Sequence, residues 1–225
     1  MQIKGVIFDL DGTLVHTIED LADSANTLFK RHGLPGYPVE SFIQWIGDGA
    51  AKFIEHGIGS VIDKNQVQDY VLEFKEIYSQ NLNKKSRLYG GIDTMLDVLI
   101  EKNIKISLLS NKPHQFTLDV AHNYLKKWPF DAILGQRDEV PRKPDPSSAL
   151  EIAQKMEIDP AHILFIGDSA GDIRTAIAAG MIPVWVSWGY GSPEPDIKNL
   201  SIVIHEPAEI PALLPQQAKS EKSNI

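Results

Sequence analysis

An α/β fold built on a parallel sheet is the prediction for this chain, and three observations support it. Five short apolar runs are typical of buried strands. Helical patterns separate most of these runs, and strands that alternate with helices indicate a parallel sheet covered by helices on both faces. The stretch from about Val15 to Arg87 breaks this alternation, because it contains helical patterns and no clear strand. We therefore expect a small all-helical insert after the first strand.

The first strand is predicted at residues 6–8, immediately before a cluster of polar residues. The helical insert follows it. Thr17, with an acid three residues later, is typical of a helix start, and the helix that it begins ends at Gly33. After a loop rich in proline and glycine come two further helical runs, of which one stops at Gly47 and the other covers residues 66–82. This insert is expected to lie over the edge of the sheet at which the first strand ends.

The remaining predicted strands alternate with helices. The strands are expected at residues 104–109, 132–134, 163–166 and 183–186. Amphipathic helical patterns at residues 92–100, 150–156 and 173–178 precede three of them. In such sheets ligands bind outside the carboxyl ends of the strands.

These elements divide the chain into two predicted domains and a tail. Residues 1–15 and 88–215 are expected to form the α/β core domain, and residues 16–87 the helical cap domain. Residues 216–225 are polar and are expected to be a flexible tail.

Composition restricts the partners. The formal net charge of −8 leaves no basic excess for nucleic acid or an anionic membrane, although a small phosphorylated metabolite remains a suitable partner. The chain contains no cysteine, which excludes disulfides, thiolate metal sites and a cysteine nucleophile. Its first residues show no signal-peptide layout, and no apolar run approaches the roughly 20 residues of a membrane span. We expect a cytoplasmic protein, as a monomer or a homodimer.

Polar side chains follow three of the predicted strands at the point where each strand ends. In chain order they are Asp9, Asp11 and Thr13, then Ser110 and Asn111, then Asp168 and Asp172. A parallel sheet brings these groups to one edge, and a loop can bring Lys143 to the same place. The sequence therefore predicts four carboxylates, a lysine and small hydroxyl groups in one crevice.

These residue types suit phosphoryl transfer. Carboxylate oxygens are suitable ligands for Mg²⁺, which usually takes one or two carboxylates together with phosphate oxygens. A further carboxylate can attack phosphorus and form an aspartyl-phosphate. Hydroxyl groups such as those of Thr13 and Ser110, together with Lys143, can neutralise the phosphoryl oxygens. A second acid near the nucleophile can protonate the leaving oxygen and then activate water.

In this order and combination, the clusters resemble the four motifs of the haloacid dehalogenase superfamily. The resemblance covers the chain to about residue 215. It implies a Rossmann-like parallel-sheet core with a small helical cap between the first and second motifs. It also implies that Asp9 is the nucleophile and that Asp11 is the general acid and base.

The resemblance further implies which groups bind the metal and the phosphoryl group. The Mg²⁺ ligands would be Asp9, the backbone carbonyl of Asp11, and Asp168. The phosphoryl-binding group would consist of Thr13, Ser110, Asn111 and Lys143. Asp172 would support the site, either near the metal or paired with Lys143. Ser110 also has a simpler interpretation as the cap of the helix that follows it.

Two segments are similar to those of phosphoglycolate phosphatases. One is Ser110-Asn111-Lys112-Pro113, and the other is the segment at residues 45–50, which is similar to their cap loop. The resemblance implies that this loop closes over the substrate, with Gly47, Asp48 and Gly49 near the site entrance. The two glycines have the alternative role of ending one helix and starting the next. His16 stands where many relatives have an aspartate, and it is expected to affect the hinge to the cap.

The predicted function is Mg²⁺-dependent hydrolysis of a small phosphate monoester, most similar to phosphoglycolate hydrolysis. A phosphatase for pyrophosphate, a nucleotide or a sugar phosphate is an alternative, as is a phosphomutase of the same superfamily. A dehalogenase of this superfamily needs no second acid, so Asp11 argues against it. A phospho-accepting receiver domain is the non-enzyme alternative, but receivers usually carry adjacent acids after the first strand.

Overall fold

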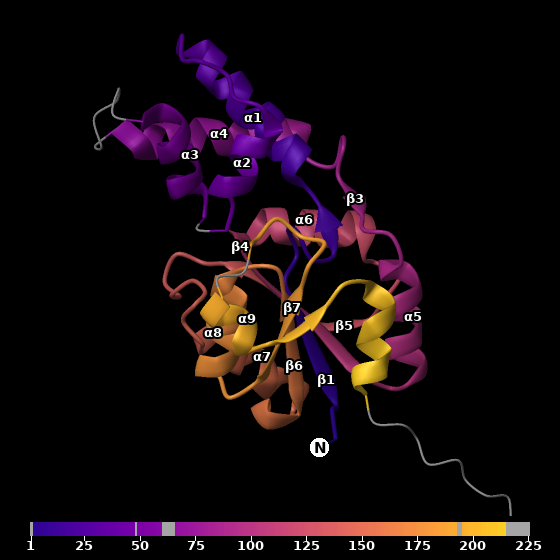
Figure 1. Ribbon diagram of the computed structural model, residues 1–225. Helices are drawn as coiled ribbons and strands as arrows, with labels where there is room; N and C mark the ends of the chain where they lie inside the picture. Colours follow the sequence, from indigo (N-terminus) through magenta and orange to yellow (C-terminus); the bar gives the residue numbers. More distant parts are fainter. Residues whose placement is uncertain (1, 48, 60–65, 193–194, 215–225) are drawn as a thin grey trace, which may run out of the picture.

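The computed structural model describes residues 2–47, 49–59, 66–192 and 195–214. Within these ranges, six strands form one parallel sheet in the order β5-β4-β1-β6-β7-β8 (Figure 1). Their bounds are Gly5–Phe8 for β1, Lys105–Pro113 for β4, Phe130–Gln136 for β5, Ile163–Gly167 for β6, Ile182–Val186 for β7 and Ile202–Ile204 for β8. The predicted α/β fold with a parallel sheet is confirmed, and β8 is a strand that the sequence patterns did not predict.

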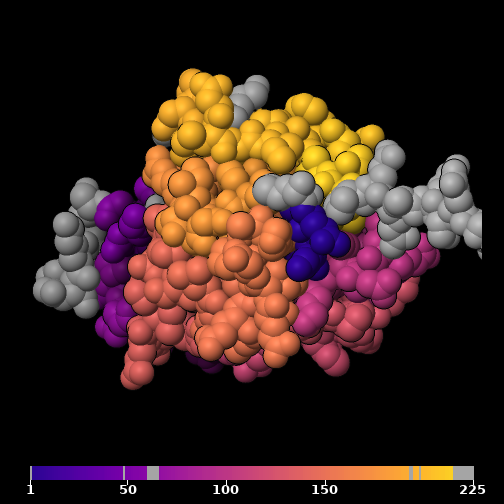
Figure 2. All heavy atoms as spheres, turned by 90° about the horizontal axis from the view of Figure 1, so that it is seen from below, coloured from indigo at the N-terminus to yellow at the C-terminus, as the bar shows by residue number. Residues whose placement is uncertain are grey.

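The central strand β1 is apolar on both faces, which is why it is buried between two layers of helices. Val6 and Phe8 belong to the core on one face, and Ile7 to the core on the other. The first face is covered by α5 (Ile92–Glu101), α6 (His114–Tyr124) and η4 (Pro207–Leu213), and the second by α7 (Ser147–Met156) and α8 (Ala170–Ala178). Figure 2, seen from the side opposite the helical insert, shows the N-terminal segment surrounded by later parts of the chain.

The helical insert has a hydrophobic core of its own. It consists of α1 (Ile18–Arg31), α2 (Val39–Trp45), α3 (Ala50–Ile58) and α4 (Val67–Asn81). Phe29, Phe42 and Ile54 are fully buried among these helices. Figure 1 shows the insert over the edge of the sheet at which β1 ends.

Two short strands lie at the limits of the insert, so the expectation of a segment without strands is wrong at both ends. β2 (Val15–His16) pairs antiparallel with β3 (Arg87–Leu88). His16 packs edge-on against Tyr89 and Tyr190 at this junction. The exact domain limits, at residues 15/16 and 87/88, stay a prediction, and the predicted tail at residues 216–225 lies outside the described residues.

The first helix of the insert begins where it was predicted, but for a different reason. α1 follows Thr17, whose hydroxyl makes no capping hydrogen bond. Instead, the Tyr190 hydroxyl accepts hydrogen bonds from the backbone N–H groups of Thr17 at 2.7 Å and Ile18 at 3.1 Å. A tyrosine from the core therefore completes the amino end of a helix in the insert, where backbone N–H groups lack partners within the helix. Within the described ranges, no helix has the length and apolar character needed to cross a membrane.

Candidate active site

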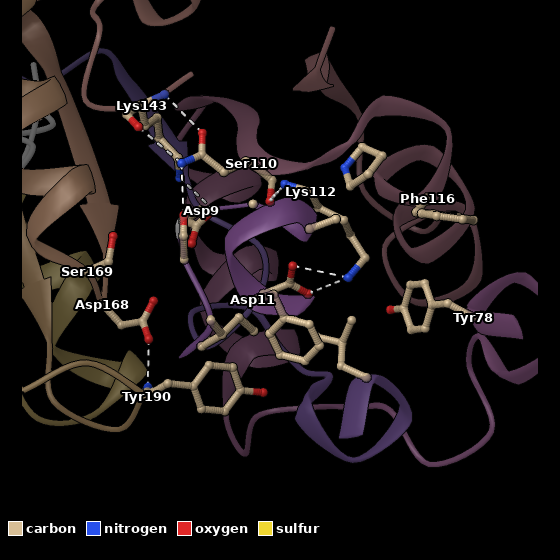
Figure 3. Close-up of a pocket in the computed structure, with 18 of the residues that line it drawn as sticks. Asp9, Asp11, Tyr78, Ser110, Lys112, Phe116, Lys143, Asp168, Ser169 and Tyr190 are labelled. Carbon is tan, nitrogen blue, oxygen red and sulfur yellow. Dashed lines mark hydrogen bonds and ion pairs between the residues drawn. The ribbon is translucent and has the colours of Figure 1, made fainter. Parts of the chain in front are cut away.

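Three of the predicted site residues meet at the carboxyl edge of the sheet (Figure 3). Asp9 follows β1, Ser110 lies near the end of β4, and Asp168 follows β6. β4 and β6 are the direct parallel neighbours of β1 on its two sides. The three side chains are close because each lies at the end of the central strand or of one of its neighbours. β4 continues to Pro113, so Ser110 does not cap α6.

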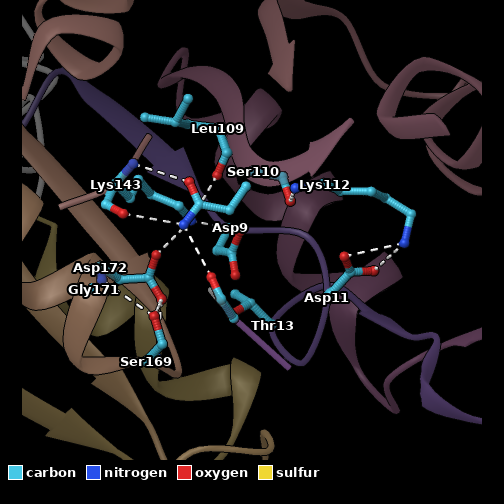
Figure 4. A network of polar contacts seen from close by, with 12 residues as sticks. Asp9, Asp11, Thr13, Leu109, Ser110, Lys112, Lys143, Ser169, Gly171 and Asp172 are labelled. Atoms are coloured by element: carbon cyan, nitrogen blue, oxygen red, sulfur yellow. Dashed lines mark hydrogen bonds and ion pairs between the residues drawn. The ribbon is translucent and has the colours of Figure 1, made fainter. Parts of the chain in front are cut away.

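Lys143 lies at the centre of a buried polar network (Figure 4). Its Nζ is 2.8 Å from Asp9 Oδ1 and 2.6 Å from Asp172 Oδ1, and it donates to the Leu109 carbonyl at 3.1 Å. Burial alone would lower the pKa of Lys143, but the carboxylates of Asp172 and Asp9 offset this and raise it. Lys143 therefore stays charged and holds one oxygen of Asp9 in place.

Asp168 is fixed by the loop that follows β7. Its Oδ2 accepts hydrogen bonds from the backbone N–H groups of Tyr190 at 2.6 Å and Gly191 at 3.3 Å, and the Thr13 hydroxyl donates to Oδ1 at 3.3 Å. Gly12 has a φ of 88°, and a Cβ at this position would lie 2.3 Å from Asp168 Oδ2. The turn after β1 thus needs a glycine both for its backbone conformation and for the close approach of Asp168.

Asp172 has two structural roles at once. Its Oδ2 accepts from the backbone N–H of Ser169 at 2.9 Å and from the Ser169 hydroxyl at 2.5 Å, as part of a capping box that begins α8. Its other oxygen pairs with Lys143. Of the two alternatives that the sequence left open for Asp172, the structure contains the pairing with Lys143, while the carboxylate also stays near the other acids.

The buried carboxylates form a cluster that can hold a divalent cation. Ligand oxygens of Asp9, Asp168 and Asp172 all lie within 4.8 Å of one another, and all three residues are buried. Desolvation raises the pKa of Asp9, against the opposing effect of Lys143, and desolvation with the charge of Asp172 raises the pKa of Asp168 to about 7. Two of the three acids, Asp9 and Asp172, pair with Lys143, and a divalent cation would balance the remaining negative charge. An all-oxygen donor set is the kind that Mg²⁺ prefers.

The Asp11 carboxylate is directed toward Lys112 rather than toward Asp9 (Figure 4). Lys112 Nζ lies 3.1 Å from Asp11 Oδ1 and 3.2 Å from Oδ2. The Thr17 hydroxyl donates to Asp11 Oδ1 at 2.6 Å. Because Lys112 belongs to β4 and Thr17 precedes α1, Asp11 connects the core to the first helix of the insert.

Asn111, which is predicted to bind phosphate, makes three hydrogen bonds to the protein in the structure. Its Nδ2 donates to the carbonyls of Gly47 at 3.0 Å and Lys143 at 3.2 Å, and its Oδ1 accepts from the backbone N–H of Lys143 at 2.9 Å. Both N–H donors of the side chain are therefore already engaged. These bonds connect the loop that carries Lys143 to the helical insert, and the role of Asn111 in phosphate binding stays a prediction.

The loop between α2 and α3 reaches the site. Gly47 and Gly49 both line the pocket described below, and both have a positive φ, of 117° and 87°. Gly47 follows the end of α2, and Gly49 immediately precedes α3. The two glycines therefore lie at the pocket and also stand between the end of one helix and the start of the next, so both interpretations of them are compatible with the structure. Asp48 lies outside the described residues, so its role at the entrance stays a prediction.

A pocket extends from the carboxylate cluster to the helical insert (Figure 3). Its polar end is formed by groups from the core: Asp9, Asp11, Ser110, Lys112, Lys143 and Asp168. Its opposite end is mainly apolar and is formed by α2 with the residue that follows it, α3, α4 and α6: Ile43, Ile46, Phe53, Phe74, Tyr78 and Phe116. A bound molecule would therefore contact both the core and the insert.

Comparison with known proteins agrees with this geometry. The family model described as haloacid dehalogenase-like hydrolase matches residues 6–186. The chain belongs to this family. It is 34% identical over 196 residues to a phosphoglycolate phosphatase of Haemophilus influenzae, and the alignment covers 84% of this chain and 88% of that protein. It is 31% identical over 216 residues to a phosphoglycolate phosphatase of Pseudomonas putida, and the alignment covers 93% of this chain and 78% of that protein.

The likeness extends to a solved structure. The crystal structure of a predicted phosphoglycolate phosphatase from Haemophilus somnus has a TM-score of 0.85 and 28% sequence identity, and the match covers 93% of this chain and 97% of that one. The predictions of a haloacid dehalogenase-type enzyme and of its similarity to phosphoglycolate phosphatases are confirmed.

Sequence reasoning did not predict the contacts around Asp11. The pairing with Lys112 had one available signal, because Ser110 and Lys112 are two positions apart in a strand and can share a face. Both do line the pocket. The contacts of Thr17 with Asp11 and of Tyr190 with α1 had no local signal. In sequence, Tyr190 lies 173 residues from Thr17 and 172 residues from Ile18.

Proposed function

We propose that this member of the haloacid dehalogenase-like family is a cytoplasmic, Mg²⁺-dependent phosphatase for small phosphate monoesters, with 2-phosphoglycolate as its preferred substrate. The observation that carries the proposal is the buried cluster of Asp9, Asp168 and Asp172, in which Asp9 and Asp172 pair with Lys143. Such a cluster suits the developing charge of phosphoryl transfer, which depends mainly on positioning and electrostatic stabilisation. The preference for 2-phosphoglycolate rests on the names of the relatives.

Asp9 is the proposed nucleophile. In the first step one of its carboxylate oxygens bonds to phosphorus, the bond from phosphorus to the ester oxygen breaks, and Asp11 gives a proton to the departing alcohol. In the second step Asp11 takes a proton from a water molecule, the water oxygen bonds to phosphorus, and the bond between phosphorus and Asp9 breaks. Inorganic phosphate leaves, and both carboxylates return to their starting forms.

The other residues bind and orient. Lys143 holds Asp9 and adds positive charge beside the phosphoryl oxygens, to which Ser110 and Thr13 are proposed to donate hydrogen bonds. We propose that Asp9, the backbone carbonyl of Asp11, and Asp168 hold Mg²⁺. When bound, this ion supplies charge neutralisation for the phosphoryl group.

Removal of Mg²⁺ is expected to have a pH-dependent effect on stability. The pKa of Asp168 is raised from 3.8 to about 7 on folding, so between these values the folded chain holds a proton that the unfolded chain has lost. The stability of the metal-free protein therefore falls as pH rises through this window. Mg²⁺ binds the charged carboxylates, so we expect it to raise the melting temperature more at about pH 8 than at about pH 5.5.

Thermal unfolding with and without Mg²⁺ at the two pH values measures this effect. Asp168→Asn serves as the matched control, since it removes the titrating group and one proposed ligand while keeping the size of the side chain. A Mg²⁺ effect that is equal at both pH values, or unchanged in Asp168→Asn, contradicts the assignment.

A panel of phosphorylated metabolites tests the substrate. We expect release of inorganic phosphate with Mg²⁺ and the highest kcat/KM for 2-phosphoglycolate, ahead of pyrophosphate, nucleotides and sugar phosphates. Release of phosphate also separates a phosphatase from a phosphomutase, which would isomerise a sugar phosphate instead. A rank near the bottom for 2-phosphoglycolate would refute the substrate and leave the phosphatase mechanism in place.

A further inference from the structure

Beyond Asp11, the pocket contains a lysine and a hydroxyl group that the proposed mechanism does not use. The Lys112 side chain is 3% exposed, and its Nζ lies 4.8 Å from the centroid of the Tyr78 ring. Tyr78 is 1% exposed, and its hydroxyl has no hydrogen-bond partner within the described residues. Figure 3 shows this hydroxyl directed toward Lys112 and Asp11. Both groups line the same pocket as the carboxylate cluster.

Lys112 and the Tyr78 hydroxyl have no anionic neighbour when the Asp11 carboxylate turns toward the leaving oxygen. A buried hydroxyl without a partner and a buried ammonium group without a counter-charge are both costly. In the structure Asp11 supplies the anion for Lys112. To give a proton to the leaving oxygen, Asp11 must instead face the phosphoryl site at Asp9. An anionic group on the substrate would then replace Asp11 beside Lys112.

We propose that Lys112 Nζ and Tyr78 Oη bind a carboxylate on the leaving group, so that the preferred substrates are phosphate monoesters of short hydroxy acids. A carboxylate can accept from both donors, since it has two oxygens and no hydrogen to donate. The apolar end of the pocket offers few hydrogen bonds to a sugar or a base, because Ile43, Phe53 and Phe74 have no polar side-chain atoms. This inference rests on the proposed phosphatase function and specifies its substrate class.

The length of the leaving group follows from the order of the residues along the pocket. Asp11 lies between Asp9 and Lys112 in Figure 3. With the phosphoryl group at Asp9, the ester oxygen faces Asp11 and the next atoms point toward Lys112. A carboxylate on a short chain from the ester oxygen is therefore directed toward Lys112 and Tyr78, at the border between the polar and apolar ends of the pocket.

The test compares two substrates of nearly equal shape, 2-phosphoglycolate and its neutral amide, 2-phosphoglycolamide. The quantity measured is the ratio of their kcat/KM values with Mg²⁺. We expect Lys112→Met to lower this ratio by about 30-fold and Tyr78→Phe by about 5-fold, because each removes a hydrogen bond to a charged group. Lys112→Arg keeps the charge and is expected to retain most of the ratio.

Lys75→Met is the matched control, because Lys75 is a second lysine on the pocket wall and is only half-buried. It is expected to change the ratio by less than about threefold. Tyr78→Phe is a conservative change, so it keeps the proposal testable if Lys112→Met does not fold. Circular dichroism of each variant identifies a folding defect.

The outcomes separate the two proposals. Equal losses on both substrates in Lys112→Met would mean that Lys112 acts only by positioning Asp11, and this would overturn the inference. So would a ratio that changes in Lys75→Met and not in Lys112→Met or Tyr78→Phe. If the wild-type protein hydrolyses neither substrate, or if hydrolysis survives replacement of Asp9, the proposed function itself is wrong.

Discussion

Replacing Asp9 with Asn is expected to abolish turnover and to leave the fold intact. An amide oxygen can still accept the hydrogen bond that Lys143 gives to Oδ1 of Asp9, so the buried network keeps its geometry. The amide cannot act as the nucleophile, and loss of a covalent catalytic group typically lowers kcat by about 10⁴-fold or more. Steady-state release of phosphate from 2-phosphoglycolate measures the effect.

The control for this variant is Asp97→Asn, which removes a half-buried carboxylate that pairs with Lys127 and accepts from the Trp128 indole but does not line the pocket. It is expected to keep wild-type activity. Both variants should give the circular dichroism spectrum of the wild type. Full activity in Asp9→Asn would refute the assignment of the nucleophile and with it the proposed mechanism.

Replacing Asp11 with Asn is expected to have the second largest effect, and its size should depend on the leaving group. General acid–base catalysis contributes about 10²- to 10⁴-fold, so turnover of 2-phosphoglycolate should fall by this range. Transfer from p-nitrophenyl phosphate to Asp9 should be affected much less, because nitrophenolate leaves without a proton. Hydrolysis of the aspartyl-phosphate still needs Asp11 as a base, so the phosphorylated form should accumulate.

Pre-steady-state release of nitrophenolate measures this accumulation as a burst equal to the number of active sites. Thr17→Val is the control, because it removes the hydroxyl that contacts Asp11 and keeps the carboxylate. That variant should show no burst. Equal losses with both substrates and no burst in Asp11→Asn would contradict the role of Asp11 as acid and base.

The sheet could be predicted because its strands are short apolar runs followed by polar residues. Val6, Ile7 and Phe8 are buried on both faces of the sheet, and such strands appear in a sequence as unbroken apolar runs. The position of Asp9 and Asp168 at the ends of strands follows from the same pattern. The short strands β2, β3 and β8 have two or three residues each, and segments of this length carry no reliable periodicity.

The site could be predicted as a set of residues but not as a network. The sequence indicated that Asp9 and Asp168 would converge, because each follows a strand at the sheet edge, and that a loop could bring Lys143 to the same place. The hydrogen bonds of Asn111 could not be predicted, because its partners Gly47 and Lys143 are 64 and 32 residues away and only the folded chain brings them to its side chain. The pairing of Lys112 with Asp11 depends on tertiary contacts in the same way.

Chemical trapping of the phosphorylated enzyme tests the central claim most directly. Asp11→Asn is mixed with p-nitrophenyl phosphate and Mg²⁺, quenched in acid and reduced with borohydride, which converts an aspartyl-phosphate to homoserine. The proposed mechanism predicts homoserine at position 9 by peptide mass spectrometry, and none in Asp9→Asn treated in the same way. Homoserine at another aspartate, or a full burst of nitrophenolate with no modified carboxylate, would contradict Asp9 as the group that carries the phosphoryl.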